Sequence, residues 1–167
     1  EYIGLPADAP QGFGNYLSEH IFGIAPFASV NYIDISATDA DAECARYASL
    51  LGEAPIDIVV MGIGENGHIA FNEPFSSLQS RTRIKSLTTD TIIANSRFFE
   101  GDVNKVPKTA LTVGVGTVMD AKEVLIVVNG HNKARALQHA IEGCVSQEWT
   151  ISALQMHPHA IIVCDEA

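Results

Sequence analysis

Residues 61–74, MGIGENGHIAFNEP, hold the side chains of this chain that are best suited to chemistry. His68 lies there with an amide, Asn66, and a carboxylate, Glu73. A histidine titrates near neutral pH, so a carboxylate and an amide that orient its ring make it a proton shuttle. We therefore predict acid–base chemistry by these three residues on a small hydroxylated substrate. The competing interpretation is structural: His68 caps the loop and Glu73 lies in solvent.

The glycines of this stretch also fit the G-x-G-x-x-G spacing of a dinucleotide-binding turn, in the letters GIGENG of residues 62–67. In such a site the glycines open a helix, and an acidic residue follows about twenty residues later at the end of a second strand. Here Pro74 interrupts the segment and Asp90 lies at the start of a predicted helix. We expect no nicotinamide cofactor, and we assign the glycines to a sharp turn and a close approach to a ligand.

Metal binding is the third chemistry that this stretch could carry. His68 with Glu65 and Glu73 lacks a third nitrogen or sulfur ligand at hairpin or helical spacing, which a zinc site needs. The second histidine pair, HPH at residues 157–159, has a proline between its rings and no further ligand nearby. We predict no metal site and no cofactor.

Cations suited to a phosphate lie in two other segments. The letters NGHNKARAL follow a predicted strand and open a helix, so free backbone N–H groups and Lys133 could converge on an anion. Arg97, late in another predicted helix, is a second cation with bidentate geometry. The alternative is that both are solvated helix charges. SRTRIK, residues 80–85, places three cations in six residues and is either a solvated face or a separate anion site.

Composition limits the class of protein. The chain has 167 residues, of which 47% are hydrophobic and 18% charged, as in a soluble globular domain. Its net charge of -10 disfavours nucleic acid and anionic membrane partners. No apolar run is long enough to span a bilayer and no export signal is evident, so we expect a cytoplasmic protein. The three cysteines are odd in number and widely spaced, which predicts reduced core thiols.

The elements that position these side chains follow from hydrophobic periodicity, and they alternate between helix and strand. Such alternation predicts an α/β fold, with a mainly parallel sheet flanked by helices on both faces, a partial Rossmann-like three-layer sandwich in one domain, 1–167. Sites in such sheets lie beyond the carboxyl ends of the strands, where residues 61–74 fall. We predict helices over 11–22, 38–52, 89–99, 114–119, 131–142 and 151–155, and strands over 29–33, 56–61, 83–87, 109–113, 123–128 and 160–164.

Six longer blocks resemble one known family: EYIGLP, GHIAFNEP, SSLQSRTRIK, TIIANSRFF, VPKTALTVGVGTVMDA and WTISALQMHPHAIIVCDE. They are similar to the glucosamine-6-phosphate deaminase family, also called glucosamine-6-phosphate isomerases. The match runs nearly end to end from Ile56 and is looser over 7–53. The resemblance implies conversion of glucosamine 6-phosphate and water to fructose 6-phosphate and ammonia. That reaction of amino-sugar catabolism proceeds by ring opening, aldose–ketose isomerisation and loss of ammonia, without metal or redox cofactor.

The resemblance also implies roles for individual residues. His68 matches the acid–base histidine of ring opening, Glu73 the carboxylate that supports it, and Asn66 a position that is aspartate in many members. Because Asn66 cannot ionise, it would act on His68 by hydrogen bonding alone. Arg97 and Lys133 match the ligands of the substrate phosphate.

A second set of matches concerns regulation. Ser76, Arg83 and Lys85 match the separate allosteric site at which some bacterial members bind the activator N-acetylglucosamine 6-phosphate. Bacterial members of the family are homohexamers, so the resemblance implies a homo-oligomer with an amino-sugar phosphate as its small-molecule partner.

One family position falls outside this sequence. The aspartate that moves the proton between C1 and C2 stands directly before EYxGLP, and that position would precede Glu1. The resemblance therefore implies a large fragment of a deaminase subunit, with little turnover by itself. Two alternatives stay open: a non-deaminating sugar-phosphate isomerase or lactonase on the same fold, and a sugar-phosphate-binding regulatory paralogue.

Overall fold

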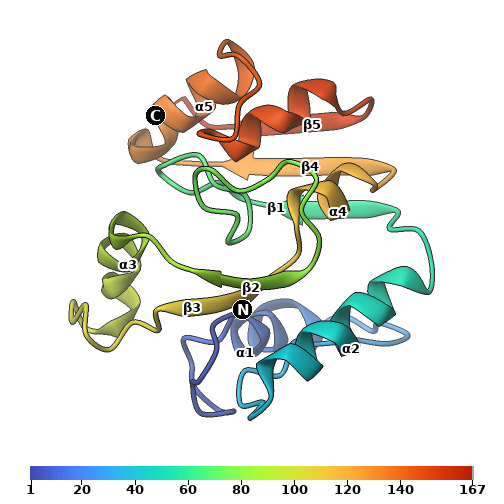
Figure 1. The fold of residues 1–167 in the computed structure, drawn as a ribbon, viewed down its shortest axis with the longest axis vertical. Coiled ribbons are helices and arrows are strands. Elements are labelled where there is room, and N and C mark those ends of the chain that lie inside the picture. Colours follow the sequence, from blue (N-terminus) through green and yellow to red (C-terminus); the bar gives the residue numbers. More distant parts are fainter. Residues whose placement is uncertain (167) are drawn as a thin grey trace.

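The computed structural model describes residues 1–166, which form a mixed α/β structure with two sheets (Figure 1). The larger sheet is parallel, with the strand order β1-β4-β5. The predicted α/β class, with its parallel sheet and helices, is confirmed. The parallel strands are β1 (Ile58–Met61), β4 (Glu123–Val128) and β5 (Ala160–Cys164).

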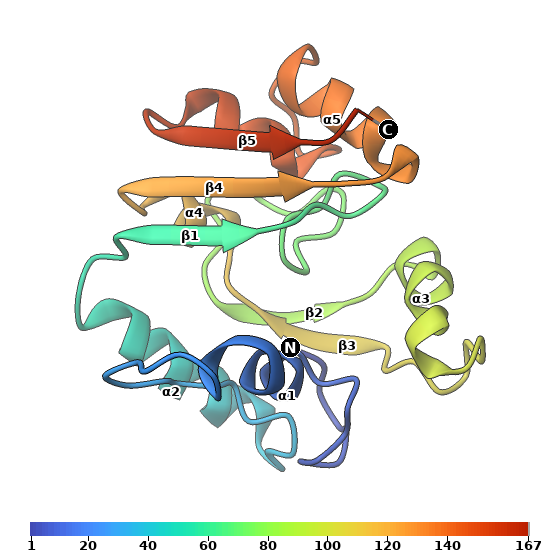
Figure 2. The same ribbon diagram turned by 180° about the vertical axis from the view of Figure 1, so that it is seen from behind.

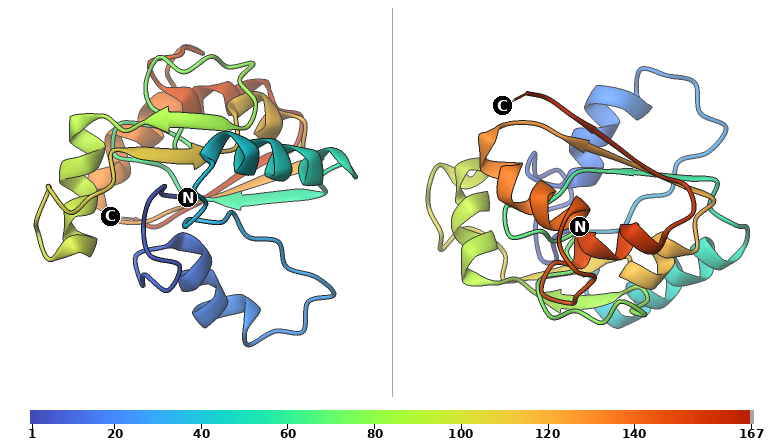
Figure 3. Two further views of the ribbon diagram at one scale, coloured as in Figure 1. Left: turned by 60° about the horizontal axis from the view of Figure 1, so that its bottom comes forward. Right: turned by 90° about the horizontal axis from the view of Figure 1, so that it is seen from above.

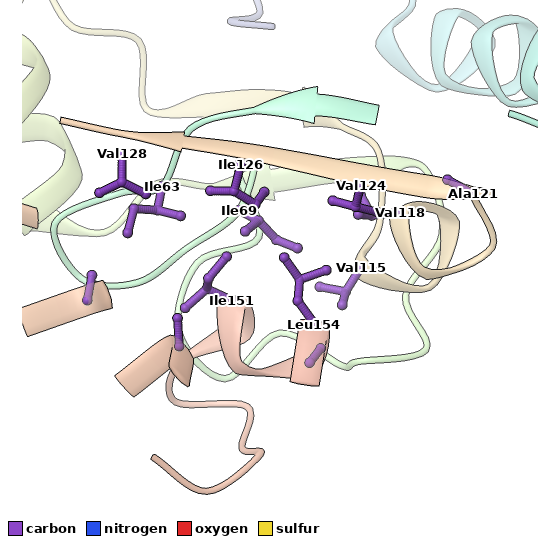
Figure 4. Close-up of a cluster of buried hydrophobic side chains, with 13 residues drawn as sticks. Ile63, Ile69, Val115, Val118, Ala121, Val124, Ile126, Val128, Ile151 and Leu154 are labelled. Atoms are coloured by element: carbon purple, nitrogen blue, oxygen red, sulfur yellow. The ribbon is translucent and has the colours of Figure 1, made fainter. Parts of the chain in front are cut away.

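One face of the parallel sheet carries the main core. Short helices pack there, and Figure 4 shows the buried aliphatic side chains between them and β4. Ile69, Ile126 and Ile151 are completely buried in this cluster. Each such side chain contributes about 1.5–3 kcal/mol by leaving water. The helices of this layer are α4 (Val115–Met119), α5 (Ala134–Ile141) and the 3₁₀ helix η4 (Thr150–Met156), and η3 (His131–Lys133) leads into α5.

The opposite face of the sheet is apolar and exposed. Alternate residues of the edge strands point to it, and Val60 is 61% exposed while Ile161 is 53% exposed. Figure 2 looks onto this face, with the strands in front of the core helices. We expected helices on both faces of the sheet. Within residues 1–166, however, helices pack against only one face.

The smaller sheet is antiparallel and pairs β2 (Arg83–Ser86) with β3 (Thr109–Thr112). Both strands were predicted, whereas their antiparallel pairing in a separate sheet was not. A second core cluster joins Tyr2 and Phe71 to residues from β3 and the segment around it. From the end of this sheet the chain enters α3 (Thr89–Asn95) and the 3₁₀ helix η2 (Ser96–Phe99), as Figure 3 shows on its left.

The segment before β1 contains α1 (Phe13–Leu17), the π-helix η1 (Ser18–Phe22) and α2 (Ala40–Gly52). The predicted helix over 38–52 starts two residues later, at Ala40, because Asp39 caps it and accepts a hydrogen bond from the N–H of Ala42 at 2.9 Å. The predicted strand over 29–33 is wrong. Its apolar pattern is suitable for a strand, but no neighbouring strand pairs with it.

The cysteines are free, as predicted, but Cys144 and Cys164 are exposed and are not core thiols. Cys164 stands at the end of β5, where the uncovered face begins, and Cys144 follows the end of α5. In the part of the chain that is described, no helix has the length and apolar character to cross a membrane.

Candidate functional site

A cavity of about 810 Å³ lies beyond the carboxyl end of β1. Its wall includes the glycine-rich loop, η2 and the start of α5. The predicted position of the site, beyond the ends of the parallel strands, is where this cavity opens. The polar and ionisable side chains that line it include Glu65, Asn66, His68, Arg97, Lys133 and Arg135.

Two glycines allow the loop to pack against its own functional side chain. A Cβ placed on Gly64 would lie 2.3 Å from the His68 ring, and one on Gly67 would lie 2.3 Å from Trp149. Gly67 also has a positive φ of 77°, which disfavours any other residue. These glycines therefore serve close packing around His68, and the loop does not open a helix as a dinucleotide site would.

His68, Asn66 and Glu73 form one hydrogen-bonded chain. The Nδ1 atom of His68 lies 2.6 Å from Oδ1 of Asn66, and Nδ2 of Asn66 donates to Oε2 of Glu73 at 3.1 Å. A carboxylate only accepts hydrogen bonds, so Asn66 turns its NH₂ group to Glu73 and its oxygen to His68. Nδ1 of His68 then carries a proton, and the basic atom of the neutral ring is Nε2.

Glu73 is an ionised group held inside the protein. Its residue is only 2% exposed, and Oε2 also lies 3.5 Å from Nδ1 of His68. Burial by itself would raise the pKa of Glu73, but hydrogen bonds from His68, Thr91 and Asn66, together with the charge of His68, lower that pKa to about 2. Glu73 is therefore a carboxylate at any physiological pH.

Thr88 is a supporting residue that sequence analysis missed. Its N–H donates to Oε1 of Glu73 at 3.1 Å and its hydroxyl to Oε2 at 3.2 Å. The same hydroxyl accepts from the N–H of Thr91 and so caps α3. The position directly before a predicted helix start was the available signal for the cap. Nothing in the sequence linked it to Glu73.

Buried polar residues hold the loop from below. Asn72 is fully buried and donates to the carbonyls of Ile69 at 3.0 Å and Val113 at 2.8 Å. The hydroxyl of Thr150 donates to the carbonyl of Asn72 at 2.9 Å. The loop backbone includes Ala70 with a φ of 49°, a left-handed conformation that these contacts maintain. Sequence analysis named neither Asn72 nor Thr150.

Arg97 and Lys133 are the two cations that we predicted as ligands of a phosphate. Arg97 comes from η2 and Lys133 from η3, and both line the same space. Burial lowers the pKa of Lys133, while the charge of Glu65 raises it and that of Arg97 lowers it. Nη1 of Arg97 lies 3.8 Å from Oε1 of Glu65. Two cations 36 residues apart in sequence thus line one cavity near Glu65, and this part of the cavity is the candidate anion-binding corner.

Ser76, Arg83 and Lys85 are separate from this cavity, since none of them lines it. Arg83 and Lys85 alternate along β2 and so share one face of that strand. Arg83 donates to Oδ1 of Asn72 at 2.8 Å, which connects this face to the loop of His68. Ser76 is buried, and within residues 1–166 its hydroxyl has no hydrogen-bond partner.

No group of three or more His, Cys, Asp or Glu residues is arranged for a metal within the described residues. His157 is buried, and its Nε2 lies 2.9 Å from the carbonyl of Ala121. Its Nδ1 accepts from the N–H of His159 at 3.1 Å. The histidine pair at 157–159 therefore has a packing role at the entry to β5.

The chain is similar in sequence to known proteins over nearly its whole length. Residues 5–163 match the sequence model of a family described as glucosamine-6-phosphate isomerases/6-phosphogluconolactonase. The whole chain is 63% identical to a glucosamine-6-phosphate deaminase of Phocaeicola vulgatus and 63% identical to one of Parabacteroides distasonis. It spans 65% and 63% of the length of these two relatives.

Solved structures place the fold in the same group. The chain superposes on a monomeric glucosamine-6-phosphate deaminase with a TM-score of 0.91 at 37% identity, covering 99% of this chain and 70% of that one. A 6-phosphogluconolactonase from Trypanosoma brucei shares the fold, with a TM-score of 0.77 at 17% identity over 99% of this chain and 69% of that one. The chain belongs to the glucosamine-6-phosphate isomerase/6-phosphogluconolactonase family.

Proposed function

We propose that the whole protein is a glucosamine-6-phosphate deaminase, which converts glucosamine 6-phosphate and water to fructose 6-phosphate and ammonia. The observation that carries the proposal is the His68–Asn66–Glu73 chain beside a cavity that Arg97 and Lys133 also line. Relatives at 55–63% identity that bear this name support it.

In this proposal the phosphate binds Arg97 and Lys133, and the sugar extends toward His68. Nε2 of His68 takes the proton of the C1 hydroxyl and returns it to the ring oxygen, which opens the ring. Glu73 stabilises the imidazolium that forms between the two transfers, and Asn66 fixes the ring orientation. The open-chain aldose is then ready for isomerisation.

Proton transfer between C1 and C2 needs a second base. The family resemblance places an aspartate for this step directly before the position of Glu1. Glu1 lines the same cavity, and its carboxylate accepts from the N–H groups of Tyr2 and Gly14 at 2.8 Å. Water then adds at C2 and ammonia leaves from the same carbon, so that glucosamine 6-phosphate and water become fructose 6-phosphate and ammonia.

Regulation, assembly and location belong to the same proposal. We assign an allosteric site for N-acetylglucosamine 6-phosphate to Ser76, Arg83 and Lys85, supported by the two cations on one face of β2 and the contact from Arg83 to Asn72. We propose a cytoplasmic homo-oligomer, a hexamer on the family resemblance. The similar solved deaminase is described as monomeric, so the molar mass in solution tests the assembly directly.

The test is ammonia release from glucosamine 6-phosphate by the whole protein, with 6-phosphogluconolactone hydrolysis measured in parallel. Ammonia release that depends on His68 supports the proposal. Lactone hydrolysis without ammonia would instead make the protein a lactonase. Binding of the sugar phosphate with turnover of neither substrate would make it a regulatory paralogue.

A further inference from the structure

Glu65 lies in the anion-binding corner, and the proposed reaction gives it no task. Its side chain is 39% exposed, and Oε1 lies 3.8 Å from Nη1 of Arg97, whose side chain is 55% exposed. Among the described residues, Arg97 is the one cation within 4.0 Å of this carboxylate. A negative charge thus occupies the place where a phosphate is expected to bind.

The charge of Glu65 also acts on the second cation. Lys133 is half-buried, and the charge of Glu65 opposes the lowering of its pKa by burial and by Arg97. Without a ligand, two cations in one corner repel each other, and a carboxylate between them relieves part of that repulsion. A phosphate that enters the corner supplies the same relief with more charge.

The contact between Glu65 and Arg97 is suited to exchange. It is long for an ion pair, and both side chains reach solvent, so the pair contributes little to stability. The buried carboxylate of Glu73 is held in place by hydrogen bonds from Asn66 and Thr88, whereas the pair of Glu65 and Arg97 can open at small cost. The carboxylate can therefore move aside without disturbing the fold.

We propose that Glu65 is an internal stand-in for the substrate phosphate, which pairs with Arg97 in the empty site and which the phosphate displaces on binding. The inference rests on the proposed function and adds a specificity-determining residue to it. Displacement of one carboxylate by another gains no charge, whereas a phosphate dianion brings a second one. Glu65 thus selects phosphorylated sugars over sugar acids with a single carboxylate.

The test is calorimetric titration of the chain with inorganic phosphate. Glu65→Gln removes the competing charge, and Glu148→Gln removes a charge that lines the same cavity without an ion pair to Arg97. We expect the dissociation constant for phosphate to fall about fivefold in Glu65→Gln and to stay near its original value in Glu148→Gln. In the Arg97→Gln background, Glu65→Gln should give no such gain, since the two effects are coupled.

Three results would overturn the inference. Weaker or unchanged phosphate binding by Glu65→Gln would mean that Glu65 positions Arg97 for the ligand. Equal gains in Glu65→Gln and Glu148→Gln would mean that only the net charge of the cavity matters. Absence of phosphate binding in the original chain and in every variant would show that Arg97 and Lys133 do not form a phosphate site. Failure of the proposed function is distinct, because phosphate binding can tighten in Glu65→Gln while the whole protein releases no ammonia.

Discussion

The two proposed parts of the site, which we call the acid–base end and the anion end, are built in opposite ways. At the acid–base end, Asn66, His68 and Glu73 come from one loop and are held by short hydrogen bonds around a buried carboxylate. At the anion end, Arg97 and Lys133 come from distant segments, and the shortest charged contact is 3.8 Å between exposed side chains. In the proposed mechanism the first end is preorganised for proton transfer, and the second can rearrange around a ligand.

The two ends also respond differently to acid. Glu73 has its charge stabilised by the fold, so lowering the pH removes a folded-state interaction. At the anion end the carboxylate that contacts Arg97 is Glu65, whose side chain is 39% exposed and is not held by the fold in this way. Mutations at the acid–base end should therefore change the rate of the reaction and the stability in acid. Mutations at the anion end should change the affinity for the ligand.

The largest expected effect is on the rate. His68→Asn in the whole protein should lower the turnover number for ammonia release about 10²–10⁴-fold, because the proton of ring opening loses its carrier. Its melting temperature should fall by a few degrees, because Glu73 loses one of the groups that stabilise its charge. The exposed His131→Asn is the matched control and should keep full activity. Activity in His68→Asn within a factor of two of the original would remove His68 from the mechanism.

The next effect is on stability and depends on pH. The pKa of Glu73 is lowered from 4.5 to about 2 in the folded chain. Its contribution, roughly 3 kcal/mol, is therefore fully present above pH 4.5 and is lost as the pH falls toward 2. Urea unfolding should show Glu73→Gln to be less stable than the original at pH 7 and nearly equal to it close to pH 2.

The matched control for that experiment is Glu123→Gln, at an exposed position on β4. It should leave the difference between neutral and acidic pH as in the original chain. If Glu73→Gln lost the same free energy of unfolding at pH 7 and near pH 2, the carboxylate charge would not be the stabilising group.

A smaller loss is expected from crowding the acid–base loop. Gly64→Ala places its methyl group against the His68 ring and should lower the free energy of unfolding by about 1–3 kcal/mol. Gly52→Ala, in a helix with open space around its Cβ, should be neutral or stabilising by about 0.5–1 kcal/mol. Thermal or urea unfolding of the two variants checks this. Equal stability of both would show that the loop moves to accommodate the methyl group and that the predicted clash has no cost.

The smallest effect in free energy is expected at the anion end. Arg97→Gln should weaken binding of inorganic phosphate about tenfold, or about 1.4 kcal/mol, by removing one charged partner. The free energy of unfolding should change by less than about 0.5 kcal/mol, because the side chain is 55% exposed. A large loss of stability without a loss of affinity would reverse the contrast between the two ends.

Sequence patterns predicted most helices and strands well, since each depends on local periodicity. The strand over 29–33 failed because an apolar pattern does not provide a neighbour for pairing. Thr88 was missed for a related reason: its contacts to Glu73 join residues 15 positions apart in two different segments. The exposure of Cys144 and Cys164 was missed because it depends on which layers cover the sheet.

By itself, the sequence determined the parallel α/β class and the acid–base loop. Asn66, His68 and Glu73 stand within eight residues, so the loop brings them together by short-range turns that its glycines permit. Tertiary structure alone decided that β2 pairs with β3 in a second sheet and that Glu65 meets Arg97 in one corner. Those contacts depend on how whole layers pack, and the free energy of packing is not encoded in any local pattern.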